Sequence, residues 1–325
     1  MSKPKVFVTR VVPDKGLELV KDFCDVDLWT GELAPSREEL LQHIQGVDGV
    51  LSLLTDKIDA EVMDAAGTQL KVISNFAVGF DNIDVSAATT RKIPVGNTPD
   101  VLTDSTADFA FALMLSAGRR ILEGDRYVRA GKWQTWGPML LLGIEMKGST
   151  LGLVGFGRIG KAMVRRAVGF DMRVIYYDPN ETGFDSNVKA TSVDLETLLE
   201  ESDFISLHTP LTLATHHLID SEALSKMKPS VILVNTSRGP VVDLNALYEA
   251  LKSKRIFAAG LDVTEPEPLR ADHPLLTLDN VVIVPHIASA TKTARDKMAW
   301  LAAKNLIAGL KGEHLPNCVN PQVYK

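Results

Sequence analysis

The sequence predicts an α/β protein made of two doubly wound parallel sheets. Short runs rich in Val, Ile, Leu and Phe alternate with helix-periodic segments through most of the chain. The runs mostly lack the alternation of a half-exposed strand, so they are typical of strands buried on both faces of a parallel sheet. Repeated strand–helix units of this kind build open, doubly wound sheets. The length of 325 residues favours two domains over one.

The expected strands fall into two series. The first covers Val6–Thr9, Val26–Trp29, Val50–Leu54 and Val72–Phe76. The second covers Thr150–Val154, Val174–Tyr177, Phe204–Leu207, Val231–Val234, Ala258–Val263 and Val281–Val284. A long helix is expected from Thr103 to Ala130 between the series, and another from Thr291 to Leu310 after them. We therefore expect a discontinuous smaller domain, residues 1–100 and 290–325, and a second domain, residues 101–289.

Composition and charge narrow the function classes. The net charge of −6 provides no global basic field for nucleic acid or anionic lipid, so neither partner is expected. No stretch approaches the roughly 20 apolar residues of a membrane helix, and the first ten residues lack the apolar run of a signal peptide. Cys24 and Cys318 are far apart in the chain and form no framework, which favours a cytoplasmic protein.

A glycine motif follows the first strand of the second series. It reads Gly155-x-Gly157-x-x-Gly160, and a helix-periodic segment begins within it. Glycines there allow a tight turn, backbone approach to a pyrophosphate, and close packing of helix on strand. The helix N-terminus adds free N–H groups, and Arg158 adds a positive charge. The context of strand, glycines and helix predicts a dinucleotide site, which a lone motif would not.

The next strand ends in Asp178, 18 residues after Gly160. A carboxylate there accepts hydrogen bonds from ribose hydroxyls and repels a 2′-phosphate, which predicts NAD rather than NADP. The alternative is an ordinary glycine turn followed by a surface aspartate. The remaining cofactor-contact candidates come from the motif helix and from later strand ends: Ile159, Thr209, Pro210, Thr215 and Thr236.

Three later strands end in residues suited to acid–base chemistry on an anion. Arg238 follows one strand, Glu265 and Glu267 follow the next, and His286 follows the last. The carboxyl ends of parallel strands share one edge of the sheet, so these groups are expected to converge. Arginine binds a carboxylate through a planar fork, and histidine donates a proton near neutral pH when a carboxylate is beside it. Taken singly, each could be an ordinary loop residue; their conjunction predicts hydride transfer to a 2-oxo acid.

The other histidines give less evidence of a catalytic or metal-binding role. His216 and His217 are adjacent, and neighbours on a helix do not share a face, so they are not expected to act together. No spacing predicts a zinc site. No G-x-S-x-G elbow and no Cys/His pairing predicts a hydrolase.

These residues resemble the D-isomer-specific 2-hydroxyacid dehydrogenase family over nearly the whole chain. The most specific stretches are Gly152–Gly160, Asn235–Asp243, Gly260–Pro268 and Val284–Thr291. Within the family, Asn97–Thr106 and Trp136–Gly143 look like the glyoxylate/hydroxypyruvate reductases. The resemblance implies a Rossmann cofactor domain, a smaller flavodoxin-like substrate domain, and a homodimer formed through the cofactor domain with a cleft that closes on binding.

The resemblance also implies roles for single residues. Arg238 would bind the substrate, Glu267 would pair with the histidine, and His286 would donate the proton. The other residues that match family positions would contact the cofactor, namely Thr106 and Asp262, or the substrate, namely Leu54, Val78 and Gly79.

Two alternatives remain beside an NAD-dependent glyoxylate or hydroxypyruvate reductase. A D-lactate or branched D-2-hydroxyacid dehydrogenase would share the chemistry and differ in the size of its substrate pocket. An NADH-sensing binding protein similar to the transcriptional corepressors would keep similar residues without turnover. Such corepressors typically carry long disordered tails, and this chain has little beyond its last expected helix.

Overall fold

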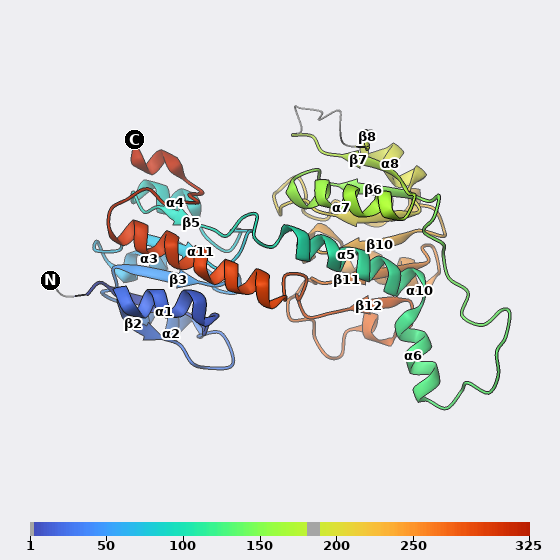
Figure 1. Ribbon diagram of the computed structural model, residues 1–325, viewed down its shortest axis with the longest axis horizontal. Helices are drawn as coiled ribbons and strands as arrows, with labels where there is room; N and C mark the ends of the chain where they lie inside the picture. Colours follow the sequence, from blue (N-terminus) through green and yellow to red (C-terminus); the bar gives the residue numbers. More distant parts are fainter. Residues whose placement is uncertain (1–2, 181–188) are drawn as a thin grey trace. The chain divides into compact units, whose positions relative to one another are not determined.

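The computed structural model describes residues 3–180 and 189–325. The chain divides into two compact units, which are labelled by element in Figure 1. The first unit contains the residues up to Leu102 together with Ala290–Lys325, and the second contains Thr103–Ser289. Among the described helices, none combines the length and hydrophobicity that a membrane-spanning segment requires.

The first unit is a five-stranded parallel sheet in the order β2-β1-β3-β4-β5. Its strands are β1 (Lys5–Val8), β2 (Asp25–Leu28), β3 (Gly49–Ser52), β4 (Val72–Asn75) and β5 (Val95–Gly96). Its helices are α1 (Asp14–Phe23), α2 (Arg37–His43), α3 (Ala60–Ala66), α4 (Val85–Thr90), α11 (Lys292–Leu310) and the 3₁₀ turn η3 (Pro321–Tyr324). This strand order is the flavodoxin-like arrangement that the family resemblance implies.

Helix α11 joins the C-terminal segment to this sheet. Gly309 faces Val72 on β4 so closely that an added Cβ would lie 2.5 Å from the Val72 side chain. Where α1 meets α11, a Cβ on Gly16 would lie 2.2 Å from the backbone oxygen of Ala299. Glycine at these two positions allows the close approach, and residues nearly 300 positions apart in sequence therefore share one core.

The second unit is a seven-stranded parallel sheet in the order β12-β11-β10-β9-β6-β7-β8. Its strands are β6 (Thr150–Val154), β7 (Arg173–Tyr177), β8 (Thr191–Ser192), β9 (Phe204–Leu207), β10 (Ile232–Asn235), β11 (Ala258–Leu261) and β12 (Val281–Ile283). Its helices are α5 (Thr103–Gly118), α6 (Ile121–Arg129), α7 (Arg158–Gly169), α8 (Leu195–Glu201), α9 (Ser221–Lys226) and α10 (Leu244–Lys252), with 3₁₀ turns η1 (Gly239–Val241) and η2 (Pro274–Thr277). The strand order reverses between β6 and β9, which is where Rossmann folds bind ligands.

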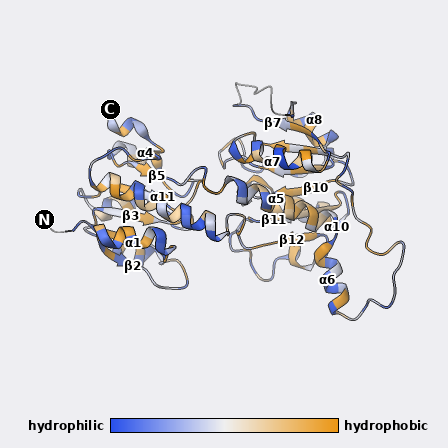
Figure 2. Ribbon diagram, viewed as in Figure 1, coloured by the Kyte–Doolittle hydropathy of each residue, from blue (hydrophilic) through white to orange (hydrophobic). Residues whose placement is uncertain are grey.

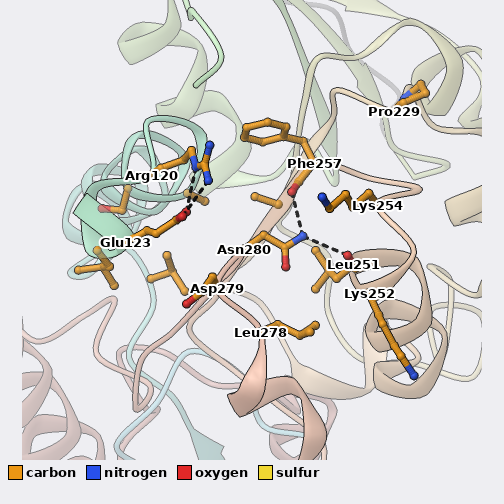
Figure 3. Close-up of a pocket in the computed structure, with 15 residues that line it drawn as sticks. Arg120, Glu123, Pro229, Leu251, Lys252, Lys254, Phe257, Leu278, Asp279 and Asn280 are labelled. Carbon is orange, nitrogen blue, oxygen red and sulfur yellow. Dashed lines mark hydrogen bonds and ion pairs between the residues drawn. The ribbon is translucent and has the colours of Figure 1, made fainter. Parts of the chain in front are cut away.

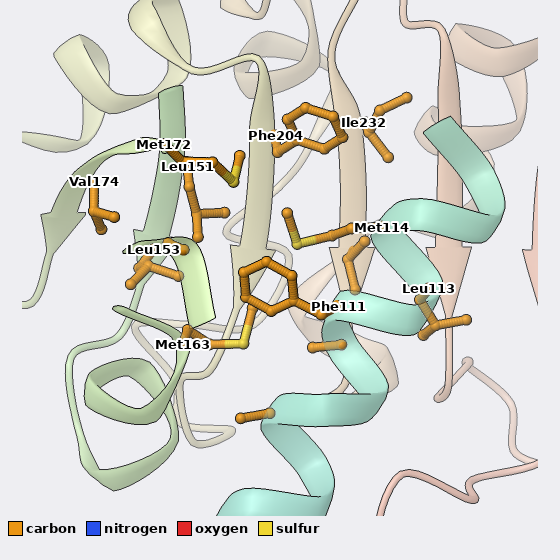
Figure 4. Packing of buried hydrophobic residues seen from close by; sticks show 14 of the residues in the cluster. Phe111, Leu113, Met114, Leu151, Leu153, Met163, Met172, Val174, Phe204 and Ile232 are labelled. Carbon is orange, nitrogen blue, oxygen red and sulfur yellow. The ribbon is translucent and has the colours of Figure 1, made fainter. Parts of the chain in front are cut away.

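A hydrophobic core covers each face of this second sheet, and Figure 2 shows the hydrophobic residues along its central strands. On one face, α5 and α7 pack on the strands, with Phe111 and Met114 near Phe204 (Figure 4). On the other face, Leu198 and Leu247 come from α8 and α10. Burial on both faces is the reason that these strands lack polar alternation.

The structure differs from the expected elements in two respects. The expectation of one continuous helix from Thr103 to Ala130 is wrong, because α5 ends at Gly118 and α6 begins at Ile121. Arg120 between them has a φ of 53°, a left-handed conformation that interrupts the helix, and its guanidinium pairs with Glu123 at 2.8 Å. The strands β5 and β8 were not predicted, since runs of two residues are too short to show periodicity.

Candidate active site

The glycine loop between β6 and α7 is tight on its protein side and open on the other. Gly155 has a φ of 93°, and an added Cβ would lie 2.6 Å from the backbone oxygen of His208. A Cβ on Gly160 would lie 2.5 Å from the Gly155 oxygen. At Gly157, which caps α7, no atom lies within 4 Å of the Cβ position. A pyrophosphate could therefore approach the backbone at Gly157, beside the N-terminus of α7.

Asp178 lies directly after β7 and is tied to this loop. One carboxylate oxygen accepts a hydrogen bond from the Phe156 N–H at 2.8 Å, and the other accepts from the Asn180 N–H at 2.9 Å. The carboxylate thus fixes the glycine loop as well as presenting lone pairs for a ribose hydroxyl. Arg158 and Ile159 open α7; Arg158 is exposed, and Ile159 packs against the core.

Two covered polar atoms at the same edge of the sheet have no partner among the described residues. His208 follows β9, and its Nε2 is 2.9 Å from the Ser206 hydroxyl while its Nδ1 is covered and unpaired. Burial lowers the pKa of His208 to about 3, so its ring is neutral. The hydroxyl of Thr236, after β10, is also buried and unpaired. Covered polar atoms normally have partners, so this edge fits a polar ligand such as a dinucleotide.

The sequence analysis did not predict a role for His208, although two of its cofactor-contact candidates, Thr209 and Pro210, directly follow this residue. In the turn after His208, the Thr215 hydroxyl donates to the Pro210 oxygen at 2.6 Å, which closes the segment after Thr209. Thr106, on α5, is buried with 4% of its surface exposed. The signal for His208 was its position at a strand end, which by itself does not separate a ligand contact from a packed core residue.

Arg238 follows β10 in a loop held by Asn235. The Asn235 amide donates to the Arg238 oxygen at 2.8 Å, and its oxygen accepts from the Ser237 N–H at 3.0 Å. A Cβ on Gly239 would lie 1.9 Å from the Thr264 oxygen, so glycine is required for this loop to lie against the turn after β11. Asn235 was not among the expected site residues, because an amide whose hydrogen bonds all stay within its own loop leaves no chemical signature in the sequence.

The turn after β11 pairs an acid with the histidine after β12. Nδ1 of His286 is 2.6 Å from Oε1 of Glu267. Glu265 lies elsewhere, 3.2 Å from Nε2 of His217. His286 has a φ of 51°, a left-handed conformation that is uncommon for a residue other than glycine. Of the two glutamates that the strand-end pattern left open, Glu267 is therefore the one that contacts His286.

Asp262 holds the His286 turn in place. One carboxylate oxygen accepts from the Ile287 N–H at 2.6 Å, the other accepts from the Ala288 N–H at 3.0 Å, and the Asp262 backbone oxygen accepts from the His286 N–H at 2.9 Å. Burial raises the pKa of Asp262, while the two N–H groups oppose that rise. A buried acid with both oxygens bonded to one turn restricts the conformation of the histidine that the turn carries.

Arg238, Glu267 and His286 follow β10, β11 and β12, which are neighbours in the parallel sheet. All three therefore lie at the carboxyl edge of the second unit, as does the glycine loop after β6. A guanidinium at this edge can bind a carboxylate, and an imidazole held by a carboxylate can give or take a proton.

A separate pocket of about 430 Å³ lies near the amino ends of the same strands (Figure 3). Its lining includes Arg120, Glu123, Phe257 and Asn280. The Asn280 amide donates to the Phe257 oxygen at 3.1 Å. Because Phe257 precedes β11 and Asn280 precedes β12, this pocket is at the opposite edge of the sheet from His286 and is not the candidate active site.

In the first unit, the expected substrate residues lie after β3 and β4. The Val78 oxygen accepts from the Asn97 amide at 2.8 Å, and the Gly79 oxygen accepts from the Asn75 amide at 3.0 Å. Within the described residues, the N–H groups of Val78 and Gly79 make no hydrogen bond. Leu54, after β3, is partly buried. The loop therefore presents two adjacent N–H donors whose carbonyls are anchored from behind.

The expectation that His216 and His217 do not share a face is wrong. Their rings stack with centroids 4.0 Å apart and an interplanar angle of 28°. The argument assumed a helix, but both residues lie outside the helices, and His217 has a φ of 50°. The left-handed conformation at His217 brings the two side chains to the same side of the chain.

Comparisons with known proteins agree with this architecture. The model of the D-isomer specific 2-hydroxyacid dehydrogenase NAD binding domain matches residues 111–288.

Glyoxylate reductase from Korarchaeum cryptofilum is 54% identical over 325 residues, covering 99% of this chain and 98% of that protein. The crystal structure of the TT0316 protein from Thermus thermophilus matches with a TM-score of 0.91 and 47% identity, covering 97% of this chain and 99% of that one. A glyoxylate reductase from Paecilomyes thermophila matches with a TM-score of 0.88 and 31% identity, covering 99% and 100%. The chain belongs to the D-isomer-specific 2-hydroxyacid dehydrogenase family and is an enzyme that works with a nicotinamide cofactor.

Proposed function

We propose that this enzyme uses NADH to reduce glyoxylate or hydroxypyruvate to the corresponding 2-hydroxy acid. The observation that carries the proposal is the 2.6 Å contact between His286 and Glu267, at the sheet edge that also bears Arg238. The substrate class is supported by relatives named glyoxylate reductase that are about half identical over nearly the whole chain.

Arg238 is the substrate-binding cation in this proposal. Its guanidinium is partly anchored, since Nη1 donates to the Ser237 oxygen at 2.9 Å. The planar fork pairs with a carboxylate through charge-assisted hydrogen bonds, and its charge also polarises the adjacent carbonyl. In a protein with a net charge of −6, such a local cation is required to hold an anionic substrate.

His286 is the proton donor. An ionised Glu267 only accepts hydrogen bonds, so Nδ1 of His286 carries the hydrogen in their contact and Nε2 holds the proton that can be transferred. A reduced nicotinamide, when bound, supplies the hydride that reaches the substrate carbonyl carbon. The carbonyl oxygen then takes the proton from Nε2, which gives the hydroxyl group, and His286 regains a proton from solvent. In the reverse direction the neutral imidazole accepts the hydroxyl proton.

The first unit contributes two neutral donors. We assign the unpaired N–H groups of Val78 and Gly79 to the substrate carboxylate, and Leu54 to contact with the substrate, as the family resemblance implies. Backbone donors bind an anion without adding a charge that would have to be neutralised when the site is empty.

Asp178 is the basis for preferring NADH to NADPH. Its carboxylate already accepts two backbone N–H groups and would repel the 2′-phosphate of NADPH. Asp178→Ala is expected to raise kcat/KM for NADPH relative to NADH by about tenfold, the equivalent of roughly 1.4 kcal/mol. Equal use of both cofactors by the wild type would contradict the assignment.

A homodimer through the second unit is also proposed. Trp136, Met139 and Trp133 follow α6 and are 78%, 76% and 62% exposed, and α6 itself buries no residue within the chain. Apolar surface of this kind marks an association face. Sedimentation should show a dimer that Trp136→Glu with Met139→Glu dissociates. Leu33→Glu is a matched control, because Leu33 is 81% exposed in the first unit and should leave the dimer intact.

We propose a cytoplasmic location because neither cysteine forms a disulfide bond. Cys24 and Cys318 are both free, and Cys24 is buried, a state compatible with a reducing compartment. Fractionation of cells that express the tagged chain would test it, and recovery from a secreted fraction would contradict it.

The decisive experiment is a comparison of substrates. NADH oxidation should be followed with glyoxylate, hydroxypyruvate, pyruvate and 2-oxoisocaproate at matched concentrations. The proposal expects the highest kcat/KM with glyoxylate or hydroxypyruvate. A preference for pyruvate would indicate a D-lactate dehydrogenase, and a preference for 2-oxoisocaproate would indicate a branched D-2-hydroxyacid dehydrogenase.

A further inference from the structure

Three metal-ligating side chains meet outside the residues used above. His216, His217 and Glu265 each place one ligand atom within 4.8 Å of the other two, and no other such group occurs among the residues the structure describes. Nε2 of His217 is 3.2 Å from Oε2 of Glu265. The stacked rings of His216 and His217 lie 4.0 Å apart. We propose that these three residues form a site for a divalent transition-metal ion of the Zn²⁺ type.

The spacing suits such an ion. A tetrahedral zinc site with bonds of about 2.0–2.1 Å separates its donor atoms by about 3.3 Å. The His217–Glu265 pair is already at 3.2 Å, so the remaining adjustment is to bring His216 and Glu265 closer together. His216 is exposed, and its ring can rotate toward the pair without disturbing a packed core. Two imidazoles and a carboxylate favour Zn²⁺, Ni²⁺ or Cu²⁺ over Mg²⁺, and three protein ligands leave a position for water.

The site is connected to the loops that bear the proposed catalytic residues. The His217 N–H donates to the Pro240 oxygen at 2.7 Å, two residues after Arg238. Glu265 lies two residues before Glu267 in the same turn. An ion that draws Glu265 toward His216 would displace the turn that holds the Glu267–His286 pair. Because a displacement of about 1 Å can lower a rate about 100-fold, occupancy should inhibit turnover. This second step rests on the proposed function.

Binding is tested without reference to activity. Calorimetry with ZnCl₂ on the purified full-length chain should show one ion per chain, and MgCl₂ should give no heat. His216→Ala and Glu265→Gln should each weaken the Zn²⁺ affinity at least tenfold, while His314→Ala, which removes an exposed histidine of the first unit, should leave it unchanged. With CoCl₂ the wild type should gain the visible absorption of tetrahedral Co²⁺. Equal Zn²⁺ affinity in the wild type and both site variants would overturn the site.

Inhibition is tested on the same proteins. Without added metal, His216→Ala should reduce 2-oxo acids at the wild-type rate. With ZnCl₂, the wild type should lose activity at the concentrations that fill the site in calorimetry, and His216→Ala should not. Inhibition that persists in His216→Ala after its binding is lost would assign the effect to His286 and Glu267 and refute the coupling. Failure of the proposed function would appear instead as no turnover of any 2-oxo acid by the metal-free wild type, with calorimetry unaffected.

Discussion

The carboxyl edges of the two sheets offer different chemistry, although both sheets are parallel and both carry their loops at that edge. In the second unit the strands end in ionisable side chains, with Arg238 after β10 and the Glu267–His286 pair after β11 and β12. In the first unit the corresponding loop offers backbone N–H groups at Val78 and Gly79, fixed from behind by asparagine amides.

The difference shows two ways in which one architecture builds a site. Charged side chains at strand ends provide binding energy and proton transfer, and they need further residues such as Asp262 and Asn235 to orient them. Backbone N–H donors orient an anion but transfer no proton. They therefore need only that the carbonyl groups of the same residues are held in place. Substitutions in the second unit should therefore affect the rate, and substitutions in the first unit should affect mainly substrate binding.

The largest expected effect is at His286. His286→Ala removes the proposed proton donor and should lower kcat by roughly 1,000-fold with little change in KM. Glu267→Gln keeps a side chain that can contact Nδ1 and should cost less. Steady-state kinetics with NADH and glyoxylate would measure both. An unchanged kcat in His286→Ala would refute the proton-donor role.

Arg238→Ala comes next. Loss of the guanidinium removes about 3 kcal/mol of charge-assisted hydrogen bonding, so kcat/KM should fall about 100-fold, with KM raised and kcat also reduced. Arg238→Lys keeps the charge without the fork and should recover part of the loss. If the lysine variant matched the wild type, bidentate binding of the carboxylate would be excluded.

The neutral state of His208 predicts an acid-sensitive stability. The unfolded chain protonates this residue near pH 6.5, whereas the folded protein resists protonation until about pH 3. Between these values the unfolded state binds an extra proton, so the free energy of unfolding should decline by up to about 1.4 kcal/mol per pH unit as pH falls. In His208→Asn this contribution is absent and the decline should be shallower. Urea unfolding from pH 7 to pH 4 would measure it, and parallel curves would count against the buried neutral ring.

The smallest effect is expected in the first unit. Asn97→Ala removes one hydrogen bond, worth about 1 kcal/mol, that anchors the Val78 carbonyl. KM for the 2-oxo acid should rise about fivefold while kcat stays near the wild-type value. Gln322→Ala, an exposed amide of the same unit, is the control. A large loss of kcat in Asn97→Ala would break the contrast between the two edges.

Local patterns were sufficient for much of the fold. The hydrophobic runs predicted ten of the strands within a few residues, because burial on both faces leaves an unbroken apolar signature. The same reasoning missed β5 and β8 and joined α5 to α6, because a single left-handed residue at Arg120 has no hydrophobic signature. Adjacent histidines were misjudged for the same reason, since the conformation of His217 is not encoded in residue spacing.

The sequence by itself determined which residue types stand at each strand end, and hence that a guanidinium, an acid and an imidazole would share an edge with the glycine loop. Tertiary structure decided which partners meet. Strand-end periodicity left Glu265 and Glu267 open, and the structure places Glu267, the one that the family resemblance implies, against His286. The structure also decided that Asp262 and Asn235 hold the turns of His286 and Arg238, and that Val78 and Gly79 keep unpaired N–H groups. The physical reason is that sequence periodicity is a local property, whereas these contacts join segments that are distant in the chain. Periodicity records whether each residue is buried, whereas a hydrogen bond between distant segments depends on angles of the backbone that only the packed chain fixes.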